Sequence, residues 1–345
     1  MRTSTRWRPP CCSNNGWRVP AEGARMHFTQ FNDRGHLRHL VTLEGLPAPL
    51  LTELLDRAEE FLHPPGELPR RSAGLAGVTV ANLFTEPSTR TRASFELAGK
   101  RLGADVINLE IQLSSRVKGE TMLDTIYTLQ AMGVDLFVIR DAEAGVHEYV
   151  AGHVQDHVSI LSAGEAHLSH PTQGLLDALA IRRHCGGFAG RTITIVGDLR
   201  HSRVARSAYH ALTTLGVGEL RLCGPAQLMP PAGEFHRARR CTSLEEGLAG
   251  ADAVMMLRIQ RERMAEALMP EVADYHAHWG LTPERLALAG RDCVVLHPGP
   301  MNRGVEIDSN VADGPQSVIQ RQVTYGVAVR MAVLEHIIRG RRQHG

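Results

Sequence analysis

The chain has 345 residues, 43% of them hydrophobic, and is long enough for two domains of ordinary size with substantial cores. Its 38 Lys and Arg nearly balance its 37 Asp and Glu, which argues against the broad basic surface of a nucleic-acid-binding protein. No apolar run approaches the roughly 18 residues of a membrane span, so we expect a soluble protein with no membrane partner. Any binding of anions must therefore be local.

The first 25 residues differ from the rest of the chain, because arginines are scattered among Pro, Ser, Asn and Gly without apolar periodicity. We expect residues 1–25 to be a disordered extension and Met26 to be an alternative start. The segment lacks the apolar core of a secretory signal. An Arg- and Ser-containing targeting peptide is the weaker alternative, since no amphipathic helix is evident.

The six cysteines show no C-x-x-C spacing, and only Cys11 and Cys12 lie close together. This pattern predicts reduced thiols in a cytoplasmic protein, in place of a zinc site or a disulfide framework. We therefore expect no metal.

From residue 40 onward, short apolar runs alternate with helical patterns. The runs are typical of parallel strands buried on both faces. They are Val78–Phe84, Asp105–Leu109, Leu136–Ile139, Ser159–Ser162, Thr192–Val196, Glu219–Cys223, Ala253–Leu257 and Cys293–Leu296. Helical patterns are found at Arg92–Leu102, Thr121–Met132, Leu175–His184, Arg203–Leu215 and Val327–Ile338. The alternation predicts an α/β protein with right-handed crossovers, and the Gly-rich stretch at 182–191 predicts a hinge between two domains.

The stretch EPSTRTR at 86–92 lies between a predicted strand and a predicted helix. Ser88, Thr89, Arg90 and Thr91 would stand at a helix N-terminus, where unpaired N–H groups and the helix dipole favour a phosphate or similar oxyanion. Four donor-bearing residues in a row favour this site over the alternative, a helix cap with surface arginines. The similar sequence TSTRW at 3–7 has no strand before it and no helical pattern after it, so we assign it no site.

A second basic loop, GDLRHSR at 197–203, also joins a predicted strand to a predicted helix. It matches neither the G-x-G-x-x-G dinucleotide turn nor a Walker loop, so we expect no nucleotide cofactor. Its arginines are suited to bidentate binding of a carboxylate.

Two further motifs carry candidate chemistry. His170 precedes Pro171, which favours an extended conformation at the mouth of a helix. The HPGP turn at 297–300 exposes backbone carbonyls, because proline supplies no N–H, and such carbonyls can orient an amine. The alternatives are an ordinary histidine, one of 18 in the chain, and a merely stiff loop.

Taken together and in order, EPSTRTR, KGET, HPTQ, VGDLRHSR, LRIQRER and HPGPMNRGVEI closely resemble the motifs of the aspartate carbamoyltransferase catalytic-chain family. The resemblance covers about residues 36–340. It implies transfer of the carbamoyl group of carbamoyl phosphate to the α-amine of L-aspartate, in pyrimidine synthesis, without a cofactor. It also implies two doubly wound parallel-sheet (Rossmann-like) domains. These would be a carbamoyl-phosphate-binding domain at 26–185, joined by a C-terminal helix at 322–340, and an aspartate-binding domain at 186–321.

The resemblance also implies roles for individual residues. Ser88, Thr89, Arg90 and Thr91 would hold the phosphate, and Thr91 would also reach the carbonyl oxygen. The carbonyl would be polarised by Arg140 and His170, and the carbamoyl NH₂ oriented by Gln173 and the backbone at Pro298 and Gly299. The two carboxylates of aspartate would bind Arg203 and Arg258, assisted by Gln260, and Glu86 would hold Arg203 across the domain cleft. Ser114 and Lys118 would enter the site from a neighbouring subunit, where Lys118 would bind aspartate and take part in catalysis, which implies a homotrimer.

Two alternatives remain open. Ornithine carbamoyltransferase shares the phosphate loop, but that family carries HCLP where this chain has HPGP. Its amine substrate has a cationic side chain, which Arg258 and Gln260 would disfavour relative to the carboxylate of aspartate. A non-catalytic scaffold subunit is the other alternative, and the joint presence of the candidate site residues argues against it. The sequence leaves open whether regulatory or dihydroorotase-like chains join the trimer.

Overall fold

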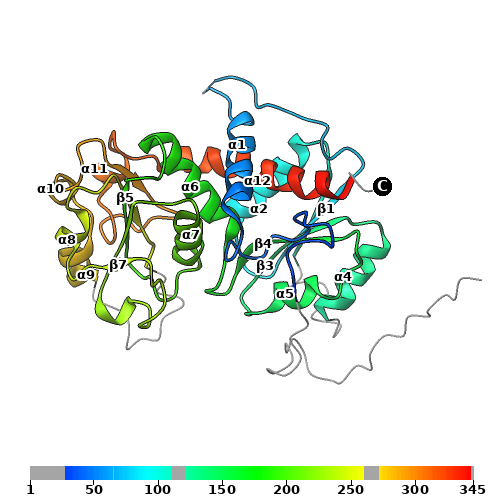
Figure 1. Cartoon of the computed structure of the whole chain (residues 1–345), viewed down its shortest axis with the longest axis horizontal. Coiled ribbons are helices and arrows are strands. Elements are labelled where there is room, and N and C mark those ends of the chain that lie inside the picture. The colour runs from blue at the N-terminus through cyan, green and yellow to red at the C-terminus, as the bar shows by residue number, and fades with distance from the viewer. Residues whose placement is uncertain (1–27, 65, 111–120, 260–271, 343–345) are drawn as a thin grey trace, which may run out of the picture.

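The computed structural model describes residues 28–64, 66–110, 121–259 and 272–342. The predicted extension at 1–25 therefore lies outside the described residues. Two parallel β-sheets lie side by side, each covered by helices (Figure 1). The predicted α/β class with two parallel sheets is confirmed.

The first sheet has the strand order β2-β1-β3-β4. Its strands are β1 (Thr79–Phe84), β2 (Asp105–Glu110), β3 (Leu136–Asp141) and β4 (Ser159–Glu165). All paired strands run parallel, and Phe84 of β1 is in register with Arg140 of β3. The chain order reverses between β1 and β3, and in open α/β sheets ligands bind beyond the carboxyl ends of strands at this switch point.

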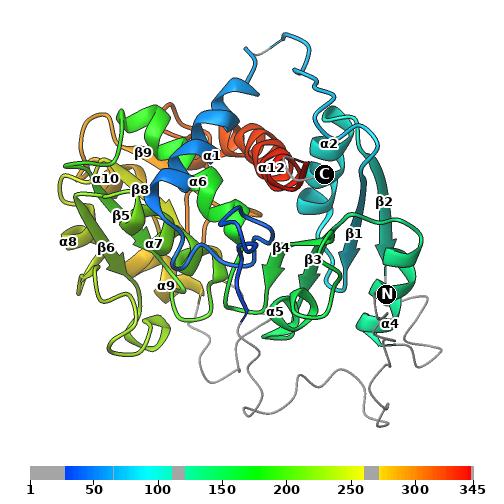
Figure 2. The same cartoon turned by 45° about the vertical axis from the view of Figure 1, so that its right-hand side comes forward.

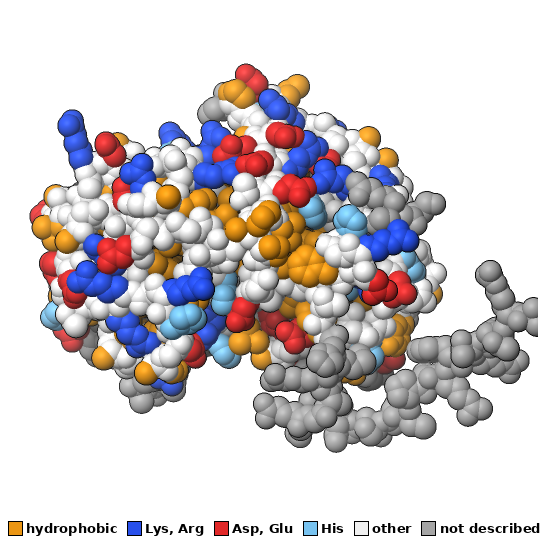
Figure 3. Space-filling model, in the orientation of Figure 1, with side chains coloured by type: hydrophobic (Ala, Val, Ile, Leu, Met, Phe, Trp, Pro, Cys, Tyr) orange, Lys and Arg blue, Asp and Glu red, His pale blue; other side chains and the backbone are white. Residues whose placement is uncertain are grey.

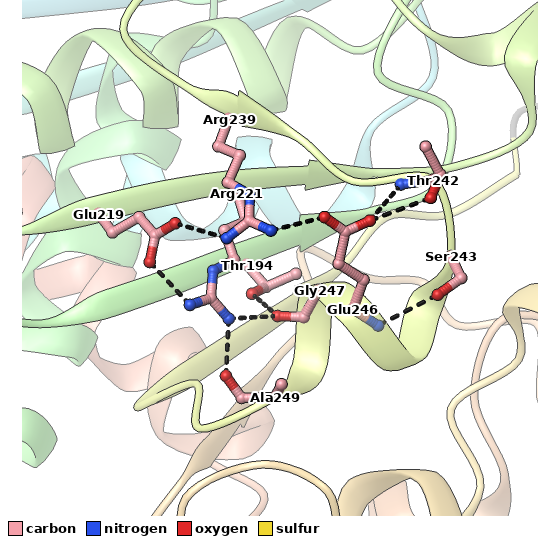
Figure 4. A network of polar contacts seen from close by, with 9 residues as sticks. All are labelled: Thr194, Glu219, Arg221, Arg239, Thr242, Ser243, Glu246, Gly247 and Ala249. Atoms are coloured by element: carbon pink, nitrogen blue, oxygen red, sulfur yellow. Dashed lines mark hydrogen bonds and ion pairs between the residues drawn. The ribbon is translucent and has the colours of Figure 1, made fainter.

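The second sheet has the order β7-β6-β5-β8-β9, so its switch point lies between β5 and β8. Its strands are β5 (Thr192–Val196), β6 (Glu219–Cys223), β7 (Arg239–Arg240), β8 (Ala253–Met256) and β9 (Val294–Leu296). A polar network holds its outer edge (Figure 4): Glu219 accepts from Arg221 and Arg239, and Arg239 also donates to Glu246 of α8. Strand β5 separates this edge from the switch point.

The helices cover the faces of both sheets. They are α1 (Ala48–Glu60), α2 (Thr89–Arg101), α4 (Met122–Ala131), α5 (Val146–Ala151), α6 (Pro171–Cys185), α7 (Arg203–Thr214), η2 (Ala226–Leu228), α8 (Leu244–Leu248), α9 (Val272–Trp279), α10 (Pro283–Leu286), α11 (Ser309–Ala312) and α12 (Ile319–Arg342). The C-terminal α12 packs against α1, α2 and α6, and Figure 2 shows it between α2 and α6. The predicted return of the C-terminal helix to the first domain is confirmed.

One large hydrophobic core joins the two halves. It includes Val80 and Leu136 of the first sheet, Ile195 of the second, Leu179 of α6 and Leu334 of α12. Helices α6 and α12 thus supply apolar surface that is continuous with both sheets. The division into domains at 185/186 stays a prediction.

Several boundaries differ from the sequence prediction. Strands β5 and β6 match it, whereas β3 and β4 continue to Asp141 and Glu165, because the strand ladder extends into polar residues. Helix α1 was not predicted, although it buries Leu51, Leu54, Leu55 and Ala58 at helical spacing.

Acidic and basic side chains are mixed on the surface shown in Figure 3, as the balanced composition predicts. Within the described ranges, no helix has both the length and the apolar character to cross a membrane.

Candidate active site

The two switch points meet at a cavity of about 690 Å³. Segments that leave β1, β5, β8 and β9 line it, as do the end of β3 and the start of α6. The lining residues are Glu86, Pro87, Ser88, Thr89, Arg90, Thr91, Arg140, His170, Gln173, Ser202, Arg203, Val204, Leu257, Arg258, Pro298, Gly299 and Pro300. The cavity therefore brings together the predicted site residues that lie within the described chain.

Helix α2 begins at Thr89, earlier than the predicted Arg92, so Arg90 and Thr91 belong to its first turn. No acidic residue lies in that turn, and no side-chain capping hydrogen bond from Ser88 is found in the described structure. The hydroxyl groups and the positive end of the helix dipole are therefore available to the cavity. This geometry favours an oxyanion site over the alternative of a simple cap.

A shared carboxylate connects the two halves of the cavity. Oε2 of Glu86 lies 3.2 Å from Nε of Arg140 at the end of β3, and it accepts a 3.0 Å hydrogen bond from Arg203 at the start of α7. Ser202, the residue before Arg203, caps α7 by accepting from the Ala205 N–H. The predicted contact between Glu86 and Arg203 is present.

Arg203 is 4% exposed and lies against the backbone of β4. A Cβ atom built on Gly164 would stand 2.9 Å from its Cζ, and Gly164 has a φ of +126°. Arg203 also donates to the carbonyl of Ala166 at 3.3 Å. Only glycine leaves room for the guanidinium in this position.

His170 is the N-cap of α6 and Pro171 lies in the first turn, but the φ of −147° and ψ of 74° of His170 lie outside the extended region that was predicted. Its backbone N–H donates to Oγ of Ser207 on α7 at 2.8 Å. Burial, followed by the positive charges of Arg203 and Arg140, holds the pKa of His170 well below its ordinary value. The imidazole is therefore neutral, and its Nδ1 has no hydrogen-bond partner among the described residues.

The third side of the cavity is the turn at Pro298 and Gly299. Their carbonyls accept hydrogen bonds from Arg90, at 2.7 Å for Gly299. Arg258, which follows β8, is half-buried at the cavity wall. The cavity wall thus carries backbone carbonyls that Arg90 contacts, together with the guanidiniums of Arg140, Arg203 and Arg258.

Gln173 is held from beneath by a buried network. Its Nε2 donates to Oδ1 of Asp177 at 2.9 Å, and Nε2 of Gln322 on α12 donates to the same oxygen at 2.7 Å. Oε1 of Gln322 accepts from the backbone N–H of His297 at 2.9 Å. Three predicted residues, Ser114, Lys118 and Gln260, lie outside the described residues.

Two family models match the chain in succession. The carbamoyl-phosphate-binding domain of aspartate/ornithine carbamoyltransferase matches residues 38–183, and the Asp/Orn-binding domain of the same family matches residues 189–337. The chain belongs to the aspartate/ornithine carbamoyltransferase family. It is a member of a family of carbamoyltransferases, as the sequence motifs predict.

Solved structures of family members share the fold. The catalytic subunit of aspartate transcarbamoylase from M. jannaschii is 32% identical, with a TM-score of 0.77 over 89% of this chain and 99% of that one. Aspartate transcarbamoylase from Trypanosoma cruzi in complex with carbamoyl phosphate is 29% identical, with a TM-score of 0.80 over 87% and 95%. Ornithine carbamoyltransferase from Thermus thermophilus, at 24% identity, has a TM-score of 0.76 over 87% and 98%, a likeness in fold.

Sequence reasoning missed the residues behind the cavity wall. Asp177 carries a signal, since it follows Gln173 by four residues on one helix face. Gln322 and Gly164 carry none, because their contacts join segments far apart in the chain. All three act on residues that the motifs do identify.

Proposed function

We propose that the chain is an aspartate carbamoyltransferase. It transfers the carbamoyl group of carbamoyl phosphate to the α-amine of L-aspartate and yields N-carbamoyl-L-aspartate and phosphate, a step of de novo pyrimidine (UMP) biosynthesis in the cytoplasm. The observation that carries the proposal is the charge of the cavity: four arginines and one glutamate line it, and the glutamate is shared by two of the arginines. Both substrates are anions that such a cavity attracts.

The carbamoyl phosphate half of the site lies at the first switch point. We assign the phosphate to Ser88, Thr89, Arg90 and Thr91 at the start of α2. The carbonyl oxygen is assigned to Thr91, Arg140 and His170, with the imidazole donating an N–H as a neutral group. The carbamoyl NH₂ is assigned to Gln173 and to the backbone carbonyls at Pro298 and Gly299.

The aspartate half lies at the second switch point, where Arg203 and Arg258 are assigned to its two carboxylates and Gln260 assists. Guanidinium groups bind carboxylates bidentately, and they would repel the side-chain ammonium of ornithine. The solved T. cruzi aspartate transcarbamoylase binds aspartate and phosphate together, which supports the same pairing here.

The chemistry needs proximity and charge stabilisation more than a strong base. The neutral α-amine attacks the carbamoyl carbon, and the C–N bond forms as negative charge develops on the carbonyl oxygen. The C–O bond to phosphate then breaks, and the leaving phosphate keeps the electron pair and accepts the amine proton. No cofactor enters this scheme.

We also propose that the working enzyme is a homotrimer, with Ser114 and Lys118 supplied by the neighbouring subunit. A native mass measurement tests the trimer, and additional mass would reveal regulatory or dihydroorotase-like chains. A mass equal to one chain in an active preparation would contradict the proposal of shared sites.

One assay tests the function. The purified chain is incubated with carbamoyl phosphate and either L-aspartate or L-ornithine, and N-carbamoyl-aspartate or citrulline is measured. We expect product with aspartate alone. Citrulline formation would assign the chain to the ornithine branch, and the absence of both products would favour a scaffold role. The His170→Ala variant should turn over slowly while it retains phosphate affinity, whereas an equal loss of both would reject the carbonyl-polarising role.

A further inference from the structure

We propose that Asp177 is a positioning residue that orients the acceptor groups for the carbamoyl NH₂, and thereby sets the preference of the site for a carbamoyl over an acyl phosphate. The inference deepens the proposed function and rests on it. Asp177 lines no part of the cavity, and it acts through Gln173 and Gln322.

The first route runs through Gln173. A primary amide has one donor end and one acceptor end, and a carboxyl oxygen that carries no proton can only accept. The Nε2 group of Gln173 must therefore face Oδ1 of Asp177, to which it donates at 2.9 Å. With the NH₂ fixed in this way, Oε1 is the end of the amide left to accept a hydrogen bond from a ligand. Without the carboxylate, the amide is free to turn its NH₂ toward the ligand's own NH₂.

The second route runs through Gln322 to the HPGP turn. The same Oδ1 of Asp177 accepts from Nε2 of Gln322 at 2.7 Å, so Oε1 of Gln322 is left to accept from the His297 N–H at 2.9 Å. Nδ1 of His297 in turn accepts from the Gly299 N–H at 2.8 Å, and its Nε2 lies 3.2 Å from Glu306. This chain of hydrogen bonds fixes the backbone that presents the carbonyls of Pro298 and Gly299.

The burial of Asp177 supports a functional reason for its charge. Its side chain is fully buried, and Oδ2 has no hydrogen-bond partner among the described residues. Burial raises the pKa of Asp177 to about 7, against the two amide donors and the nearby charges of Arg90 and Arg330, which favour ionisation. Burying a charged carboxylate carries a large desolvation cost. A role in packing alone does not require it.

The test compares two ligands that differ at one group. Acetyl phosphate carries a methyl group where carbamoyl phosphate carries NH₂, and both share the phosphate. Dissociation constants for both ligands and for inorganic phosphate are measured on the intact chain and on Asp177→Asn. We expect Asp177→Asn to lower the preference for carbamoyl over acetyl phosphate by about 10-fold or more. Binding of acetyl phosphate and phosphate should change by less than about 2-fold, since their contacts do not involve the amide acceptors.

Two further variants provide a control and a second test. Asp252→Asn replaces a hydrogen-bonded carboxylate of the second sheet, which accepts from Arg191 and the Thr192 N–H away from the cavity, and it should leave the preference unchanged. Gln322→Leu removes the second route alone and should lower the preference by a smaller factor, about 3-fold. If Asp177→Asn does not fold, the preference measured for Gln322→Leu tests the positioning role by itself.

The outcomes separate the two proposals. If the unaltered chain carbamoylates no amine, the proposed function fails. If it does so while Asp177→Asn and Gln322→Leu keep the full preference, or weaken both acyl phosphates by the same factor, the positioning role is overturned. A loss of preference without a loss of thermal stability in Asp177→Asn supports it, because a merely structural residue would not give that combination.

Discussion

Replacing Gly164 with alanine tests how the proposed aspartate half of the site is built. The added Cβ would lie 2.9 Å from Cζ and 3.1 Å from Nε of Arg203. Non-bonded heavy atoms prefer about 3.5–4.0 Å, so the guanidinium must move by roughly 1 Å. Its 3.0 Å hydrogen bond to Glu86 would then lengthen beyond hydrogen-bond range.

The size of the effect follows from that bond. A hydrogen bond between charged groups contributes about 1.5–3 kcal/mol, and the displaced guanidinium would also meet the aspartate carboxylate less well. We therefore expect the KM for aspartate to rise roughly 10- to 150-fold. The φ of +126° adds a backbone cost of about 1–3 kcal/mol, which lowers the free energy of unfolding.

Gly133→Ala provides the matched control. Gly133 has a φ of +89° and is exposed, and no atom lies within 4 Å of the position that an added Cβ would take, so its replacement strains the backbone without displacing a ligand. Initial rates are measured against aspartate at saturating carbamoyl phosphate, and urea unfolding is measured for both variants. Both should be less stable, and only Gly164→Ala should bind aspartate poorly. Equal KM values in two folded variants would refute the reasoning.

Three more predictions concern the shared carboxylate, a helix contact and acid stability. Glu86→Gln removes the negative charge that pairs with Arg140 and Arg203, and it should raise the KM for aspartate by roughly 10-fold in steady-state assays. An unchanged KM would show that these ion pairs do not support the binding of aspartate. Gly174→Ala would bring a Cβ within 2.6 Å of the Ser207 carbonyl oxygen and should cost about 1–3 kcal/mol, whereas a higher Tm would mean that helix propensity outweighs the clash. Burial lowers the pKa of His39 to about 3, while its Nδ1 accepts from the Ile160 N–H. Below about pH 6.5 the imidazole of His39 binds a proton in the unfolded chain but not in the folded chain. The free energy of unfolding should therefore fall by about 1.4 kcal/mol per pH unit toward pH 3. In urea titrations at several pH values, the His39→Asn variant should lack this contribution to the pH dependence. An identical slope in the unaltered chain and in the variant would contradict the prediction.

The sequence foresaw the parts of the site that lie on single strand–loop–helix units. Arg90 and Thr91 follow the apolar strand β1, and Arg203 follows the apolar strand β5, so local chemistry was enough to predict both loops. That the two loops line one cavity follows only from the strand order, which places the ends of β1, β3, β5 and β8 at two switch points. Periodicity does not encode that order.

The supporting contacts were beyond sequence reasoning for a different reason. Asp177 and Gln322 are 145 residues apart, and Gly164 matters only because Arg203 lies against it. Helix α1 is different, because its buried leucines have helical spacing and so carry a local signal. Long-range packing determines the contacts of Gln322 and Gly164, whereas the periodicity of residues 48–60 is sufficient to predict α1.

The charge of the cavity has a consequence for the lifetime of the protein. Four guanidiniums and one carboxylate share a confined space, which leaves an excess of positive charge, so the folded chain gains free energy whenever an anion binds. A ligand at 100 times its dissociation constant adds about 2.7 kcal/mol to the free energy of unfolding. The resistance of the chain to unfolding and proteolysis is therefore coupled to the supply of its own substrates, and it falls when those substrates are depleted.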